Sequence, residues 1–309
     1  MASWGTLSTE ASNPSSEGLD TLATEDVAAL VLEEDIRGLE AARRSLEDIG
    51  HAATWVAEAL AADGRVVFTG AGTSGRLGIL EAAECPPTFG TDPEQIQAVI
   101  AGGPEAVFKA HEGAEDIFSD GAAAVAEMGS GDLLIAVSAS SVTPFALGAL
   151  KSARAAGARS ILVTCTSADE IAGFADLVLA LDTGPEVLTG STRLKAASAT
   201  KAVLNAITTA AMVRLGKVYG NLMVDLRPGS AKLRDRALRI IEAAGAVSRE
   251  EAERLYDAAD GEVKTAIIMA SCELGVGPSR ERLRAVGGHV RQALGGQTRT
   301  EKGSSIHDE

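Results

Sequence analysis

The stretch VVFTGAGTSGRLG, residues 66–78, decides the fold of this chain. An apolar, β-branched run passes directly into a turn that is rich in glycine and hydroxyl side chains, and a helix-like segment follows. Gly70, Gly72 and Gly75 satisfy the pattern G-x-G-x-x-G, in which a buried strand leads through a tight turn into a helix N-terminus. The stretch therefore predicts one strand–helix unit of a parallel sheet.

This turn is predicted to hold a single phosphate and not a dinucleotide. A dinucleotide fold places an acidic residue near the end of its second strand, where it binds the ribose hydroxyls. Here the second strand, IQAVI (96–100), is followed by the letters AGG, so that acid is absent. Gly72, Thr73 and Ser74 instead offer hydroxyls beside the free N–H groups of a helix N-terminus, which is a suitable cradle for phosphate. The alternative is a tight turn without a ligand.

The rest of the chain repeats this alternation, which predicts an α/β fold with a doubly wound parallel sheet covered by helices on both faces. Short buried strands are expected at 65–70, 96–102, 132–140, 159–167 and 175–184. Helices are expected at 74–84, 104–113, 118–129, 143–157 and 191–216. Two further helices, at about 24–35 and 36–62, precede the sheet.

Four regions follow from this pattern. They are an N-terminal arm with helices (1–50), an α/β domain that carries the predicted phosphate turn (51–230), a small all-α domain (231–295) and a disordered polar tail (296–309). The all-α domain is expected to contain four helical segments, at 231–246, 248–260, 262–275 and 279–295.

A second hydroxyl-rich loop strengthens the phosphate hypothesis. VSASSVT (137–143) follows a buried strand and offers Ser138, Ser140, Ser141 and Thr143. Because the carboxyl ends of parallel strands share one edge of the sheet, this loop and the glycine turn can converge on one ligand. An ordinary serine or threonine helix cap is the alternative, but a cap does not require four hydroxyls.

A third candidate segment is TGSTRLKA (189–196), which begins a helix with Ser191, Arg193 and Lys195. Cations at a helix N-terminus oppose the helix dipole, so an anion, from a ligand or a partner, is expected beside them. A solvated helix start is the alternative.

Two acidic stretches are candidates for proton transfer. In ILEAAECPPTFG (79–90), prolines are expected to end the helix just after Glu84, which suits that carboxyl to a proton donor at the negative end of the helix dipole. HEGAEDIF (111–118) offers Glu112, Glu115 and Asp116 after the second strand. From spacing alone, both stretches also fit ordinary surface acids of an acidic chain.

Composition excludes several function classes. A net charge of −15 argues against nucleic acid as a partner, because phosphate neutralisation needs clustered cations. Three distant cysteines indicate reduced thiols in the cytoplasm. The first residues lack a secretory pattern, and no apolar run is long enough for a membrane span. Four histidines without ligand spacing predict no metal site.

Taken together, these motifs resemble the N-acetylmuramic acid 6-phosphate etherases, a family with the sugar isomerase (SIS) fold. The similar stretches extend from about residue 9 to residue 294 and include TEASNPSSEGLDTLATEDVAALVLEED, GAGTSGRLGILEAAECPPTFG, IAGGPEAVFKAHEGAED, GPEVLTGSTRLKA, KVYGNLMVD and VKTAIIM. The C-terminal helices resemble the ubiquitin-associated-like bundle of that family.

The resemblance implies a cytoplasmic homodimer that removes D-lactate from a phosphosugar by elimination and water addition, without a cofactor. It also implies catalytic roles for Glu84 and Glu115, which we interpret as acid and base respectively. The hydroxyl and cationic residues of the three segments above would then bind the substrate and its phosphate.

Several positions depart from the family pattern. The usual S-A-S-G-R-T-P is SASSVTP here, so Ser141 and Val142 replace glycine and arginine. Where the family usually has A-T-N, this chain has PGS (228–230), and where the family has an asparagine–proline loop, this chain has TSAD (166–169). The family's K-A-G-T-A is replaced by KAASA (195–199). Three alternatives therefore stand beside the etherase: an enzyme for a different phosphosugar or sugar conjugate, a sugar-phosphate-binding regulator, and an aldose–ketose isomerase.

Overall fold

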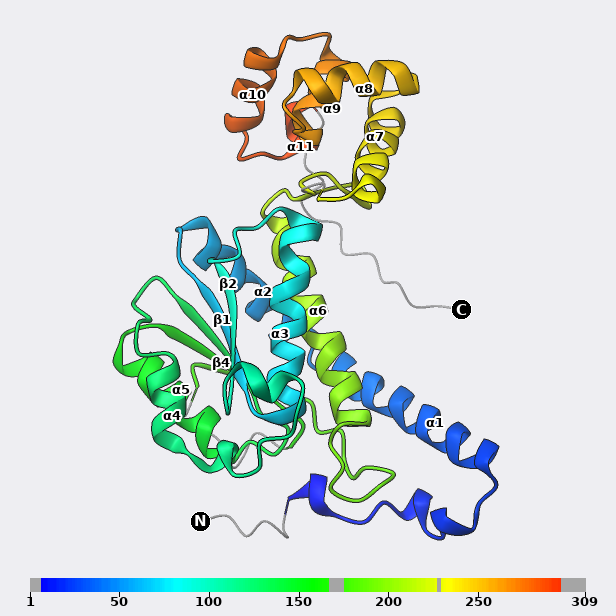
Figure 1. Cartoon of the computed structure of the whole chain (residues 1–309), viewed down its shortest axis with the longest axis vertical. Helices are drawn as coiled ribbons and strands as arrows, with labels where there is room; N and C mark the ends of the chain where they lie inside the picture. The colour runs from blue at the N-terminus through cyan, green and yellow to red at the C-terminus, as the bar shows by residue number, and fades with distance from the viewer. Residues whose placement is uncertain (1–6, 167–174, 227–228, 296–309) are drawn as a thin grey trace. The chain divides into compact units, whose positions relative to one another are not determined.

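The computed structural model describes residues 7–166, 175–226 and 229–295 (Figure 1). The chain forms two compact units: one comprises Met1–Cys85 and Thr91–Ala211, the other Pro86–Gly90 and Met212–Glu309. The predicted tail at 296–309 lies outside the described residues. The four predicted regions remain a prediction, because a compact unit is not by itself a domain that folds alone. None of the helices within the described ranges combines the length and the apolar character of a membrane-spanning segment.

A five-stranded parallel sheet forms the centre of the first unit, which confirms the predicted fold class. The strands are β1 (Val66–Gly70), β2 (Ile96–Ile100), β3 (Leu133–Val137), β4 (Arg159–Thr164) and β5 (Leu177–Ala180), in the order β2-β1-β3-β4-β5. Gly70 pairs with Ile100 on one side and with Val137 on the other. The three strands therefore end level with one another, and the loops that follow them share one edge.

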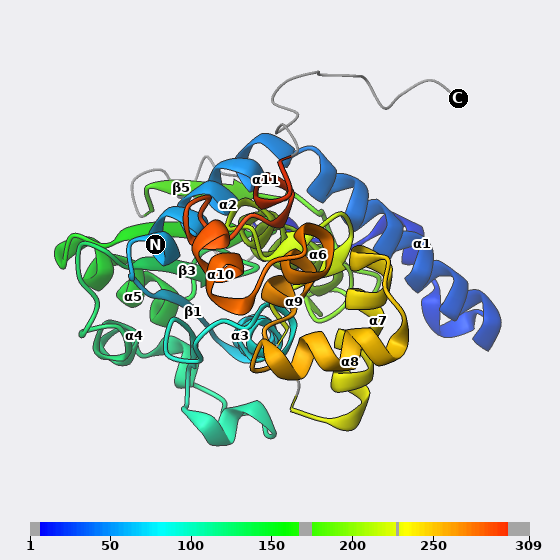
Figure 2. The same ribbon diagram turned by 90° about the horizontal axis from the view of Figure 1, so that it is seen from above.

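Helices cover both faces of this sheet (Figures 1 and 2). They are α2 (Leu46–Ala61), α3 (Gly72–Phe89), α4 (Phe118–Ala124), α5 (Pro144–Ala155) and α6 (Lys195–Arg214), whereas α1 (Thr24–Arg43) extends away from the sheet (Figure 1). On one face, Val67 and Leu134 pack with Leu150 of α5. On the other face, the backbone of Gly78 in α3 approaches Phe68 so closely that an added Cβ would lie 2.8 Å from the phenylalanine Cβ. Glycine at this position lets α3 pack directly on the sheet.

The structure corrects three predicted helices. The first two do not divide at residue 35, since α1 continues to Arg43 and the break falls at Ser45. No helix breaker stands at the predicted break. The predicted helix at 104–113 is only a 3-10 turn, Pro104–Val107, with glycines of positive φ on both sides. The predicted segment at 279–295 is two helices, because Gly287 and Gly288 adopt positive φ between them.

The second unit is helical apart from a small hairpin of β6 (Val218–Tyr219) and β7 (Leu222–Met223). Its helices are α7 (Ala231–Gly245), α8 (Arg249–Ala258), α9 (Val263–Cys272), α10 (Val276–Arg284) and α11 (Val290–Ala293). They surround an apolar core of their own, to which Leu238, Ile241 and Ile267 contribute.

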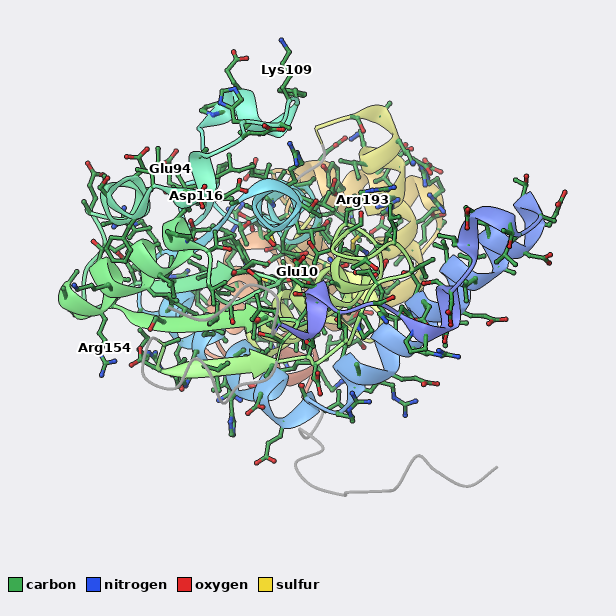
Figure 3. The ribbon with its side chains drawn as sticks, turned by 90° about the horizontal axis from the view of Figure 1, so that it is seen from below. Glu10, Glu94, Lys109, Asp116, Arg154 and Arg193 are labelled. Atoms are coloured by element: carbon green, nitrogen blue, oxygen red, sulfur yellow. The ribbon has the colours of Figure 1, made fainter. Side chains whose placement is uncertain are left out.

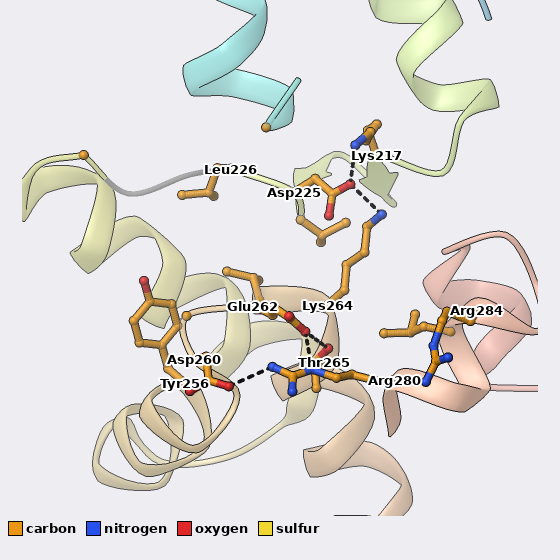
Figure 4. A pocket seen from close by; sticks show the side chains of 16 residues that line it. Lys217, Asp225, Leu226, Tyr256, Asp260, Glu262, Lys264, Thr265, Arg280 and Arg284 are labelled. Atoms are coloured by element: carbon orange, nitrogen blue, oxygen red, sulfur yellow. Dashed lines mark hydrogen bonds and ion pairs between the residues drawn. The ribbon is translucent and has the colours of Figure 1, made fainter. Parts of the chain in front are cut away.

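A cavity of about 800 Å³ lies in this second unit at the start of α9 (Figure 4). On one wall, Lys217 and Lys264 share the carboxylate of Asp225, at 3.0 and 2.7 Å. On another, Arg280 pairs with Asp260 and Glu262. Most charges of this cavity are therefore already satisfied within the unit.

Candidate active site

A pocket of about 260 Å³ lies at the carboxyl edge of the sheet in the first unit. Five segments that are far apart in the sequence form its wall, and Figure 3 labels residues from two of them, Glu10 and Asp116. The lining residues are Glu10, Ala71, Gly72, Thr73, Ser74, Glu115, Asp116, Ala139, Ser140, Thr143, Pro144 and Thr192. Among the described residues, no group of three His, Cys, Asp or Glu side chains is placed to hold a metal ion.

The glycine turn contributes Gly72, Thr73 and Ser74 to this pocket, as the sequence predicts. Gly72 begins α3 with a φ of +53°, in the left-handed region that favours glycine. A Cβ on Gly75 would lie 2.7 Å from the carbonyl oxygen of Gly70, so only glycine allows the turn to close this tightly. The first N–H groups of α3 have no partner within the helix and can bind an anion.

The four hydroxyls of the second loop divide into two pairs. Ser140 and Thr143 line the pocket. Ser138 is buried, and its hydroxyl lies 2.8 Å from that of Thr143. Ser141 is also buried and accepts a hydrogen bond from Thr166 at 3.1 Å. Ser138 and Ser141 therefore shape the loop, and only Ser140 and Thr143 are placed to contact a ligand.

Lys195, which the sequence predicts to bind the ligand, does not line this pocket. Its ammonium is buried and donates to Glu34 Oε2 at 2.6 Å and to the carbonyl oxygen of Pro185 at 2.7 Å. Arg193 is exposed, and neither Arg193 nor Ser191 lines the pocket, whereas Thr192 does. Lys195 looks available for a ligand because the sequence does not reveal its partner Glu34, which lies 161 residues away.

The anion expected at the start of α6 belongs to the protein itself. The carboxylate of Glu186 accepts hydrogen bonds from the backbone N–H groups of Lys195 and Ala196, at 3.1 and 2.9 Å. Burial raises the pKa of this carboxyl, although the two N–H groups favour its charged form. The helix N-terminus is therefore satisfied without a ligand.

The two predicted catalytic glutamates lie in different places. Glu115 lines the pocket, on a short 3-10 turn (Ala114–Asp116) that begins after Gly113 at a φ of +78°. Glu84 is exposed and does not line the pocket. From residue 72 to residue 84, α3 rises by about 18 Å at 1.5 Å per residue.

The expected helix end at Glu84 is also wrong. Pro86 and Pro87 lie inside α3, which ends at Phe89, so Glu84 is not at the negative end of the helix dipole. The buried acid of this region is Glu81, which accepts a hydrogen bond from Asn205 at 2.7 Å and another from Thr208. Burial raises the pKa of Glu81. The sequence analysis missed Glu81, and its helical position three residues before Glu84 gave no sign of burial.

Comparisons with known proteins show the family of the chain. Residues 48–154 match the glucokinase regulatory protein N-terminal SIS domain, and residues 108–210 match the SIS domain. An N-acetylmuramic acid 6-phosphate etherase of Salinibacter ruber is 46% identical over 293 residues, which are 94% of each chain. The chain belongs to the N-acetylmuramic acid 6-phosphate etherase family. An etherase of Rubrobacter xylanophilus is 47% identical, over 94% of this chain and 97% of its own. An etherase of Geobacillus thermodenitrificans is 45% identical, over 93% of this chain and 98% of its own.

One departure from the etherase pattern now has a structural consequence. Ser141, which replaces the usual glycine, adopts a φ of +66° in the left-handed region. For a residue with a Cβ this conformation costs roughly 1–2 kcal/mol. The loop therefore keeps a backbone shape suited to glycine without having glycine. Of the other departures, Ser167–Asp169 and Pro228 lie outside the described residues.

Proposed function

We propose that this protein cleaves the C3 lactyl ether of N-acetylmuramic acid 6-phosphate, giving N-acetylglucosamine 6-phosphate and D-lactate. The observation that carries this proposal is family membership: relatives named for this activity share 45–47% identity over nearly the whole chain. The pocket supports it, because hydroxyls and helix N–H groups suited to phosphate stand beside a carboxylate suited to proton transfer. The reaction makes the enzyme a carbon–oxygen lyase.

The proposed mechanism starts from the open-chain sugar, because an aldehyde at C1 acidifies the proton on C2. The phosphate is held at the start of α3 by Gly72, Thr73 and Ser74. The carboxylate of Glu115 then removes the C2 proton, and the electron pair forms a C2–C3 double bond while the C3–O bond breaks. An acid, which we assign as Glu84, protonates the departing lactate oxygen. Water adds at C3, C2 is reprotonated, and N-acetylglucosamine 6-phosphate results.

The distance between the two glutamates leads to a proposal about assembly. Glu84 does not line the pocket that contains Glu115, so the acid has to come from a second copy of the chain if both act on one substrate. We therefore propose a homodimer in which each site takes Glu115 from one subunit and Glu84 from the other. We also propose that it works in the cytoplasm, which suits its three free thiols.

The activity is tested by incubating the protein with N-acetylmuramic acid 6-phosphate and assaying D-lactate. Glu115→Gln serves as the inactive control, since the change keeps the side-chain shape. Binding of the sugar phosphate without lactate release would favour the regulator, and appearance of a ketose phosphate would favour the isomerase.

The shared site is tested by mixing the inactive Glu84→Gln and Glu115→Gln proteins under conditions that exchange subunits. In a mixed dimer one site keeps both carboxyls and the other keeps neither, so about a quarter of the wild-type activity should return. No return of activity in a verified mixed dimer would contradict the shared site.

A second candidate substrate class is favoured by one observation. Val142 replaces the arginine of the family pattern, and no Lys or Arg side chain lines the pocket in the part of the chain that the structure describes. Losing a cation weakens the attraction for a substrate that carries both a phosphate and a lactyl carboxylate. A phosphosugar without the lactyl carboxylate is the alternative substrate, and binding measurements with a panel of phosphosugars distinguish the two.

A further inference from the structure

The substrate pocket contains a carboxylate that the mechanism does not use. Glu10 lines the pocket together with Glu115 and Asp116, but it comes from the N-terminal arm, more than 100 residues earlier in the sequence. In the part of the chain that the structure describes, none of these three carboxylates has an ion pair or a hydrogen-bonded partner. An unpaired carboxylate in a substrate pocket is available to accept hydrogen bonds from a ligand.

The position of Glu10 is fixed by the arm that carries it. Glu10 is the last residue of a 3-10 turn (Ser8–Glu10), and both Leu7, which precedes the turn, and Thr9, within it, are buried. The Glu10 carboxylate also lies close to Gly190, since a Cβ added to this glycine would be 3.1 Å from Glu10 Oε2. The carboxylate therefore lies against the turn that also presents Thr192 to the pocket.

A buried polar clamp holds this arm to the rest of the unit. Asn13 donates to Glu34 Oε2 at 2.9 Å and to the carbonyl oxygen of Pro185 at 3.1 Å. Lys195 donates to the same two acceptors, at 2.6 and 2.7 Å. One clamp thus joins the arm, helix α1 and the segment before α6. Asn13 follows Glu10 by three residues and Lys195 follows Thr192 by three residues, so the clamp holds the two segments that carry these pocket residues.

The charge of the pocket indicates which part of the substrate meets Glu10. Three carboxylates and no lining cation repel an anion, so the phosphate belongs at the hydroxyl and N–H groups that begin α3. The same three carboxylates repel the lactyl carboxylate of the substrate, so the groups left to meet Glu10 are the uncharged hydroxyls of the sugar chain. A carboxylate accepts hydrogen bonds from hydroxyls and cannot donate one when it is ionised.

We propose that Glu10 is a specificity-determining residue of this site, whose carboxylate accepts hydrogen bonds from the hydroxyl groups of the sugar chain. The proposal rests on the proposed function for the identity of the sugar. It assigns to the N-terminal arm a direct part in recognising the sugar, separate from recognition of its phosphate.

The test compares Glu10→Ala with Glu17→Ala, a second exposed glutamate of the same arm that does not line the pocket. Calorimetry measures the Kd of N-acetylglucosamine 6-phosphate and, separately, of inorganic phosphate. A hydrogen bond to a charged group corresponds to about 10- to 100-fold in affinity. Glu10→Ala should weaken the sugar phosphate by that factor and leave inorganic phosphate binding as tight as in the wild type. Glu17→Ala should change neither Kd.

Kinetics add the readout that separates binding from chemistry. Glu10→Ala should raise KM for lactate release with kcat nearly unchanged. Wild-type Kd for the sugar phosphate in Glu10→Ala, or a lower kcat with an unchanged KM, would overturn the proposal. Absence of lactate release by the wild type would instead refute the proposed function, and the two Kd values would still decide the role of Glu10. A melting curve confirms that each variant is folded.

Discussion

Replacing Lys195 by methionine separates the structural role found here from the ligand-binding role that the sequence suggests. The substitution keeps most of the side-chain volume and removes the ammonium that pairs with Glu34, whose side chain is only 3% exposed. Glu34 is then left buried with fewer partners. If Lys195 instead bound the substrate phosphate, the same substitution would weaken binding and leave stability almost unchanged.

The magnitude follows from the partners that remain. Removing one member of a buried ion pair typically costs 3–5 kcal/mol. Arg37 still pairs with Glu34, but its own side chain is 57% exposed, and Asn13 still donates one hydrogen bond. We therefore expect a loss at the lower end of the range, about 3 kcal/mol in the free energy of unfolding. Arg37→Gln is the matched control and should cost at most about 1 kcal/mol.

The pH dependence of the stability difference between wild type and Lys195→Met is an independent test of the clamp. Burial alone would raise the pKa of Glu34, but hydrogen bonds from Lys195 and Asn13 outweigh it, and the pKa lies below the ordinary 4.5. A carboxyl with a lowered pKa contributes its full stability above the pKa of the unfolded chain and loses it as pH falls through the folded value. In Lys195→Met this contribution is gone. The difference in stability between wild type and variant should therefore be largest at neutral pH and shrink in acid.

Urea unfolding followed by tryptophan fluorescence is the assay, because Trp55 lies in α2 of the first unit. The Kd of N-acetylglucosamine 6-phosphate is measured under conditions in which both proteins are folded. A Lys195→Met protein within 1 kcal/mol of the wild type would refute the buried clamp. If that protein also failed to bind inorganic phosphate, the ligand-binding role would be the better explanation.

Three further predictions follow from the site and its surroundings. Glu115→Gln should slow exchange of the substrate C2 proton with deuterated water by ~10²–10⁴-fold. Glu84→Gln should slow lactate release by the same factor while C2 proton exchange continues. The opposite pattern would make Glu84 the base and Glu115 the acid. Gly75→Ala places a Cβ 2.7 Å from a backbone carbonyl and should lower stability by roughly 1–3 kcal/mol in a melting experiment, whereas Gly129→Ala, with open space around it, should not. Burial raises the pKa of the Cys85 thiol to about 12 and that of the Cys165 thiol to about 11. A thiol reagent at mildly alkaline pH should therefore label only Cys272 until urea unfolds the protein.

The sequence alone determined the strands and the glycine turn at Gly70–Gly75, because both depend on neighbouring residues. A short β-branched run reports a buried strand, and the spacing of Gly70, Gly72 and Gly75 reports a tight turn into a helix. Because parallel strands end at one edge of the sheet, the sequence also predicts that this turn and the loop with Ser140 and Thr143 lie close together. These expectations need no knowledge of contacts between distant segments.

Only the tertiary structure decided which charged residues face the pocket. Lys195 and Arg193 look alike in sequence, but Glu34 lies 161 residues before Lys195 and turns it into part of a buried clamp. Glu10 reaches the pocket from an arm whose own sequence carries no catalytic pattern. Glu84 lies outside that pocket because it is more than three turns along α3 from Gly72. The physical reason is the same in each case: a charge takes its role from the partners that desolvate or pair with it, and those partners are brought together only when the chain folds.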